Sequence, residues 1–235
     1  MAATSAAFIA KVDPFGLGSS PLSVVSTTDG KSAQVAEARD ENGDVVAYNV
    51  FGEQYSPSAD YKVVAAGAVS SFNLGKSTSW NSVKSVLTSV TISTSAGGET
   101  TVSASGESVP TTAVACPVVY AVPSFTPGVC LHAKDVFSAF TLSGTGCYLN
   151  SCTATASAEL GRATVNGETV AYGLYNGRIE ETVEIIQTGS TVPTLAAATG
   201  WVVTSPLTCT NPDADYPTWS ATLVKYLEGT TPSAN

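Results

Sequence analysis

A heptapeptide of this chain returns in closely similar form 124 residues further on. Residues 42–48 read Asn-Gly-Asp-Val-Val-Ala-Tyr and residues 166–172 read Asn-Gly-Glu-Thr-Val-Ala-Tyr, so five of seven positions are identical. Two more matches follow in the same order, 86–94 with 202–210 and 103–105 with 220–222. Three collinear matches predict two copies of one small domain, with a few insertions and deletions in loops.

The composition favours β structure in both copies. Val, Thr, Ser, Ala and Gly dominate, and only 12% of the 235 residues are charged. We predict an all-β protein of two tandem antiparallel β-sandwich or barrel domains related by internal duplication, with at most one or two short helices. The predicted divisions are an N-terminal arm at 1–21, a first β domain at 22–106, a Pro-rich connector at 107–131, a second β domain at 132–228 and a C-terminal tail at 229–235.

Turn signals place the hairpins. Asn42-Gly43 and Asn166-Gly167 are the strongest, because both residue types tolerate the positive φ of a type I′ turn. Residues 95–98 and 211–215 predict two more turns. The predicted strands are 22–25, 44–51, 61–65, 88–93, 101–104, 155–160, 168–175, 181–186 and 219–226.

Two segments depart from this pattern. Residues 79–87 are the best helix candidate, because Trp80, Val83, Val86 and Leu87 fall at helical spacing. Ser56-Pro57-Ser58 is expected to end the first long strand.

The connector is rich in proline and poor in charge. Four prolines fall within 107–130, which favours an extended segment, and no charged residue stands between Glu107 and Lys134. A segment this apolar is expected to pack against a domain or a neighbouring subunit.

The net charge of −9 argues against a protein that grips phosphate backbones, which needs a basic stripe. The first 21 residues lack the features of a secretory signal, and no run is long and apolar enough to cross a membrane. We expect a soluble product made in the cytoplasm and not secreted.

The five cysteines form no CxxC pair, and their odd number argues against a secreted disulfide framework. Buried free thiols are the expected state. The alternative is that Cys147 and Cys152 face each other across a hairpin and oxidise.

No catalytic or metal site can be assembled from the sequence. The one histidine, His132, lies near Ser124, Ser138 and Asp135, but no nucleophile motif surrounds either serine. Cys116, Cys130 and His132 match no zinc-binding spacing. We therefore expect neither an enzyme nor a bound cofactor or metal.

Acidic clusters and two tyrosines have plain structural interpretations. Glu180, Glu181 and Glu184, like Asp213 and Asp215, lack the spacing and Gly of a calcium loop, so solvated strand ends and turns are expected. The equivalent residues Tyr48 and Tyr172 are expected to lie in the core rather than at an interface.

The duplicated segment and the last strand carry a family resemblance. A strand, an Asn-Gly turn and Val-Ala-Tyr span Ala36–Tyr48 and again Ala158–Tyr172, and Tyr-Pro-Thr-Trp-Ser-Ala-Thr-Leu-Val-Lys-Tyr spans Tyr216–Tyr226. Over roughly two thirds of its length the chain resembles the tail tube (major tail) proteins of tailed bacteriophages.

The resemblance implies a virion structural protein. In that family a β-barrel or sandwich, flanked by a helix and a long loop, forms rings of six domains that stack into a hollow tube for DNA, with an acidic lumen. It implies homo-oligomerisation, other virion proteins as partners, transient non-specific passage of DNA and a place in the virion tail. With two domains per chain, either three subunits form a pseudo-sixfold ring, or six do so with one repeat outside. The alternatives are a capsid decoration or head-to-tail connector protein, or a carbohydrate-binding or adhesin module.

Overall fold

The computed structural model describes residues 13–65, 67–80, 83–115, 118–126, 133, 135–212 and 214–230. The fold is all-β, as predicted, and the described residues contain no helix. The strands are β1 (Leu22–Arg39), β2 (Val45–Val63), β3 (Phe72–Leu74), β4 (Ser77–Trp80), β5 (Val83–Ser95), β6 (Thr101–Val109), β7 (Val114–Ala115), β8 (Val119–Val122), β9 (Phe140–Ser143), β10 (Cys147–Val165), β11 (Glu168–Gln187), β12 (Thr194–Ala197), β13 (Val202–Cys209), β14 (Thr218–Tyr226) and β15 (Gly229–Thr230).

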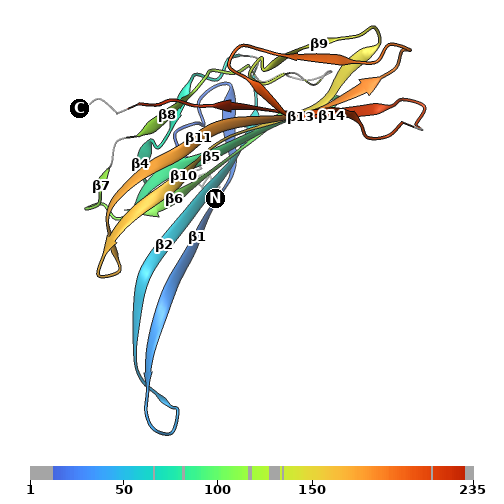
Figure 1. Cartoon of the computed structure of the whole chain (residues 1–235). Coiled ribbons are helices and arrows are strands. Elements are labelled where there is room, and N and C mark those ends of the chain that lie inside the picture. The colour runs from blue at the N-terminus through green and yellow to red at the C-terminus, as the bar shows by residue number, and fades with distance from the viewer. Residues whose placement is uncertain are drawn as a thin grey trace, which may run out of the picture.

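Most of the chain belongs to one ten-stranded sheet (Figure 1). Eight strands follow one another in the order β1-β2-β6-β5-β10-β11-β14-β13, with β4 paired to β5 and β7 to β11. All of these pairs are antiparallel except the short parallel pair of β7 and β11. The strands of the two predicted repeats meet where β5 pairs with β10. Two small sheets, β12-β9 and β15-β8-β3, complete the fold.

The long hairpins exceed their predicted strands. β2 runs without a break from Val45 to Val63, so the prediction that Ser56-Pro57-Ser58 ends it is wrong. Proline is tolerated at Pro57 because β6 pairs with β2 only from Ser58 onward. Beyond that point β2 forms a strand ladder with β1 alone, and the β1–β2 hairpin projects away from the rest of the molecule (Figure 1).

The predicted helix over 79–87 is also wrong. Its described residues belong to two strands, the end of β4 and the beginning of β5, which pair with each other. Val86 and Leu87 are both buried because a register shift against β6 follows them, so consecutive residues need not alternate between faces. Their spacing matched a helix by coincidence.

The two Asn-Gly turns differ. Asn166 and Gly167 have φ values of 53° and 83°, as a type I′ turn requires. In the first hairpin only Gly43 has a positive φ, and β1 and β2 are joined by five residues instead of two. Asp40 closes this longer loop, since its carboxylate accepts hydrogen bonds from the backbone N–H groups of Asn42 and Asp44, each at 2.9 Å.

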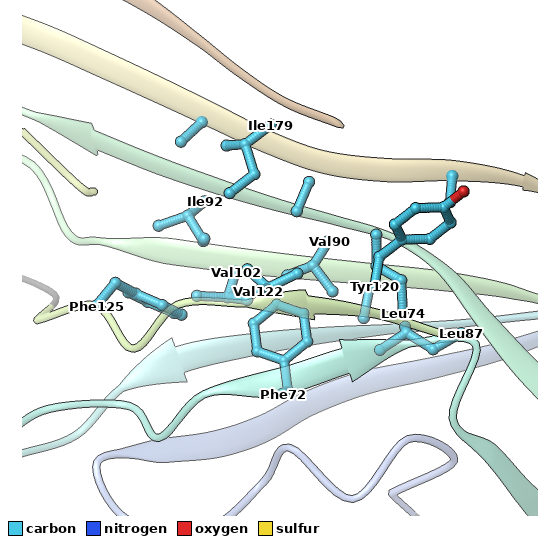
Figure 2. Packing of buried hydrophobic residues seen from close by; sticks show 14 of the residues in the cluster. Phe72, Leu74, Leu87, Val90, Ile92, Val102, Tyr120, Val122, Phe125 and Ile179 are labelled. Carbon is cyan, nitrogen blue, oxygen red and sulfur yellow. The ribbon is translucent and has the colours of Figure 1, made fainter. Parts of the chain in front are cut away.

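The core lies against one face of the large sheet (Figure 2). Val90, Ile92, Val102 and Ile179 project from it toward the covering layer. β3, β8 and the residues around Phe125 form that layer. The connector segment 118–126 is thus packed onto the sheet, in keeping with its apolar composition. The buried residues of the covering layer include Phe72, Leu74, Tyr120, Val122 and Phe125.

Candidate functional surfaces

The opposite face of the sheet is covered with hydroxyl groups. These side chains alternate along each strand with the buried residues described above, so they share one face. Several contact one another across strands, as Thr91 does with Thr155 at 3.1 Å and Thr182 with Thr222 at 3.4 Å. We call this surface the hydroxyl face. Its exposed or half-buried members are Ser26, Ser58, Ser89, Thr91, Ser93, Thr101, Ser103, Ser105, Thr153, Thr155, Ser157, Thr182, Ser220 and Thr222.

Charged groups stand singly among these hydroxyls. The Asp60 carboxylate accepts hydrogen bonds from Ser26 at 2.7 Å and Ser103 at 2.8 Å, and these bonds hold its pKa below the ordinary value. Glu180 and Glu184 lie on the same face of β11, opposite to the face of Glu181. The cations Lys62 and Arg178 are interspersed with them. The face therefore has no basic stripe of the kind that holds nucleic acid.

The sheet is open at both ends. Among the described residues, β1 pairs only with β2 and β13 only with β14. An unpaired edge presents backbone N–H and C=O groups that can accept another strand. The two edges are unlike, because β1 is 18 residues long whereas β13 has eight residues and contains Pro206.

The register of the first hairpin recurs in the second. Each register shift in the β1–β2 ladder has a counterpart 125 residues later on β10 and 124 residues later on β11. The shifts follow Val24, Ser32 and Ala38 in the first hairpin and Leu149, Ser157 and Ala163 in the second. The shift after Leu87 on β5 likewise recurs after Val203 on β13. We call two residues at the same place in these ladders register-equivalent.

Strand order is shared as well. In the first half the order is β1-β2-β6-β5, and in the second it is β10-β11-β14-β13, which joins a long hairpin to a short one in the same way. β1 and β2 therefore correspond to β10 and β11, and β5 and β6 to β13 and β14.

The two register-equivalent tyrosines have different surroundings. Tyr172 is 6% exposed, as the core prediction requires, and the Lys84 ammonium lies 5.0 Å from its ring centroid. Tyr48 is 73% exposed, so the core prediction is wrong for this residue. Val35 and Val46 on the same hairpin are also exposed. Tyr172 is covered by elements of the first half, whereas most of the Tyr48 side chain is exposed.

The burial of one acidic side chain was missed by sequence reasoning. Glu181 is fully buried, so the expectation of a solvated strand end is wrong for this residue. Its Oε1 accepts hydrogen bonds from the Cys152 thiol at 2.8 Å and from the Val136 N–H at 3.1 Å. Burial, and then the negative charge of Asp135, raises the pKa of Glu181 to about 8. Buried and outward-facing residues alternate along β11, and Glu181 shares the buried side with Ile179, Val183 and Ile185. This alternation is the sequence signal that could have predicted its burial.

Of the residues weighed for catalysis or zinc binding, the structure describes Ser124, Asp135 and Ser138. His132, Cys116 and Cys130 lie outside the described residues. Asp135 caps a turn, since its carboxylate accepts hydrogen bonds from the backbone N–H groups of Ala139 and Phe140. Within the described ranges there is no group of three or more His, Cys, Asp or Glu residues placed to hold a metal ion.

The alternative of a Cys147–Cys152 disulfide is wrong. Both residues lie on β10, where Cys147 pairs with Gln187 and Cys152 with Val183, so they do not face each other across the hairpin. Cys147, Cys152 and Cys209 are free thiols.

The other acidic cluster of the sequence is the pair Asp213 and Asp215. Asp215 is exposed in its turn, and Asp213 lies outside the described residues.

Comparison with protein-family models finds no match for this chain, and comparison with curated proteins finds none either. In the described part of the chain no helix has the length and apolar character needed to cross a membrane.

Proposed function

We propose that this protein is a structural subunit that assembles with its own copies into rings, and that stacked rings form the tail tube of a virion, a conduit for DNA. The observation that carries the proposal is the open sheet. Its outer strands β1 and β13 are the register-equivalents of β10 and β5, which pair with each other inside the chain. A junction that already joins two such units within one chain can join them between chains.

The repeated strand order and register support two copies of one unit in each chain. Three chains would then supply six units, which favours a trimer with pseudo-sixfold symmetry. In the alternative, six chains each contribute one unit to the ring and carry the other outside. That alternative is less favoured, because both halves belong to one sheet and share one hydroxyl face.

The hydroxyl face suits the wall of a DNA conduit. Neutral hydroxyl groups form no ion pair with phosphate, and carboxylates such as Glu180 and Glu184 repel it. The opposite face is covered by the small sheets and the connector, so it would lie on the outside. We propose no catalytic step, and we place the protein in the virion tail with other virion proteins as its partners.

Electron microscopy of the purified full-length protein tests this function. We expect closed rings or short stacks, and the number of chains per ring distinguishes three from six. Sedimentation velocity over a wide concentration range gives an independent measure of assembly. A protein that remains monomeric at high concentration would contradict the proposal and favour a decoration or connector role.

A further inference from the structure

We propose that a second copy of this chain docks on the β1–β2 hairpin in the arrangement that the first half of the chain adopts toward β10–β11. In this contact β13 of one copy pairs antiparallel with β1 of the next, and Lys225 of the first meets Glu37 of the second. The inference rests on the proposed self-assembly and adds its geometry.

The template is the junction between β5 and β10. Seven consecutive residue pairs join these strands, from Ser89 with Ser157 to Ser95 with Ser151. The register-equivalents of β5 and β10 are β13 and β1, and these are the two outermost strands of the described sheet. Addition of a strand to an exposed sheet edge is a common mode of recognition, since it satisfies the unpaired backbone groups.

The repeated register fixes which residues would meet. Ser205 is the register-equivalent of Ser89, and Ser32 is that of Ser157. Because Ser89 pairs with Ser157 inside the chain, Ser205 of one copy is expected opposite Ser32 of the next.

The same neighbour would cover the exposed tip of the hairpin. Inside the chain, β7 pairs with β11 at Ala171 and Tyr172, and Lys84 lies over the Tyr172 ring. Those elements belong to the half that supplies β5. The register-equivalent of Lys84 is Gly200, just before β13, and β7 has no counterpart among the described residues. A copy that supplies β13 would therefore bring the loop around Gly200 beside Tyr48, whose ring is exposed in the single chain. Burial of such a ring at an interface is favourable.

Charge complementarity supports this placement. Arg162, which pairs with Tyr172 across the hairpin, forms an ion pair with Glu107 at 2.8 Å and donates a hydrogen bond to the Ser108 carbonyl at 3.1 Å. The register-equivalent of Arg162 is Glu37, which pairs with Tyr48, and those of Glu107 and Ser108 are Val224 and Lys225. In the single chain Glu37 forms an ion pair with Arg39 at 2.5 Å on the exposed hairpin, and the neighbouring copy would bring Lys225 to the same carboxylate.

This contact is head-to-tail, because it joins different surfaces of two identical chains. Such contacts close into rings when their rotation allows it and otherwise continue as filaments.

Cysteine crosslinking tests the register. We expect the full-length Ser32→Cys, Ser205→Cys variant to form disulfide-linked multimers under mild oxidation, because paired residues of antiparallel strands lie about 5 Å apart. The variant Thr28→Cys, Ser205→Cys is the control for register, since the four-residue displacement places its thiols more than about 10 Å apart. Each single variant reports the background from the native thiols.

A charge exchange tests the second contact. We expect Glu37→Lys and Lys225→Glu each to weaken association by roughly tenfold in sedimentation velocity, and the double variant to recover most of it. Glu41→Lys, in the exposed hairpin turn, is the control for net charge.

The outcomes separate this inference from the proposed function. Rings that form without Ser32–Ser205 crosslinks and without rescue by the charge exchange would overturn this contact and leave the tube function standing. Crosslinked multimers that never close into rings would support the contact and overturn the tube.

Discussion

The Glu181 carboxylate on β11 accepts a hydrogen bond of 2.8 Å from the Cys152 thiol on β10, and both side chains are fully buried. The second oxygen of Glu181 has no hydrogen-bond partner among the described residues. An ionised carboxylate in such a place is costly, so the folded protein retains the proton to about pH 8.

This proton predicts that stability falls as pH rises. The unfolded chain releases it near pH 4.5 and the folded chain near pH 8, so between these values the folded state holds one proton more. The free energy of unfolding should therefore decrease by up to about 1.4 kcal/mol per pH unit through this window and level off above it. Urea unfolding at pH 5, 7 and 9 measures the slope.

Glu181→Gln should flatten this slope and make the protein more stable than the native chain at pH 9, because the amide cannot ionise. Glu180→Gln, on the opposite face of the same strand, is the control and should leave the slope in place. An unchanged slope in Glu181→Gln would show that another group carries it.

The same burial predicts unequal thiol reactivity. Burial, and then the nearby Glu181 charge, raises the pKa of Cys152, so little thiolate forms and little of it is reachable. Cys147 and Cys209 are half-buried. Brief alkylation of the folded protein followed by peptide mass mapping should label these two and spare Cys152. Labelling in urea should reach Cys152 as well, and rapid labelling of Cys152 in the folded state would contradict its burial.

The fold class and several turns were predictable because they depend on local pattern. The Asn166-Gly167 turn follows from residue types that tolerate positive φ, and the last strand follows from its alternation. The interruption predicted at Pro57 was wrong. Proline disrupts a strand where a second neighbouring strand needs the backbone N–H that proline lacks, and the sequence does not reveal where β6 begins to pair with β2.

Burial of particular side chains was harder to predict. Tyr48 and Tyr172 stand in nearly identical sequences, but only Tyr172 lies beneath Lys84 and β7, which come from distant parts of the chain. The hydroxyl face and the open edges depend on strand order in the same way. A sequence that encodes each hairpin does not by itself say which strand lies beside it.

The N-terminal segment is held to the sheet by Asp13. Its carboxylate accepts a hydrogen bond of 2.7 Å from the buried Tyr61 hydroxyl, and others from the backbone N–H groups of Phe15, Gly16 and Gly18. Tyr61→Phe should cost about 1–2 kcal/mol of unfolding free energy, and Asp13→Ala more, because it leaves several donors unpaired.

A double-mutant cycle in urea separates the two contributions. The double variant should be less destabilised than the sum of the two single ones, since both remove the same hydrogen bond. Strict additivity would show that the Tyr61–Asp13 bond contributes nothing in solution.

Close packing at Gly177 predicts a steric effect. A Cβ at this position of β11 would overlap the ring of Tyr120 on β8, which is itself buried. Gly177→Ala should therefore lower the unfolding free energy by about 1–3 kcal/mol. Gly30→Ala is the control, because its nearest contact would be at an ordinary 3.7 Å. Tyr120→Leu in the Gly177→Ala background should recover part of the loss, and no recovery would exclude the clash as its cause.

The hydroxyl face predicts a gain of DNA retention when its charge is reversed. Glu180 and Thr182 project from this face of β11. In an assembled ring the Glu180→Lys, Thr182→Lys variant would therefore present a circle of cations to DNA inside it. Assemblies of the native chain should not retain duplex DNA in filter binding at about 0.15 M salt, whereas the variant should retain it with a steep dependence on salt concentration. Glu228→Lys, Thr230→Lys has the same net charge but places its lysines at or beside β15, which belongs to the small sheet on the covered side. If both variants retain DNA equally, net charge alone explains the result and the hydroxyl face does not line the conduit. Retention by the β11 variant alone is the outcome that a DNA-facing wall requires.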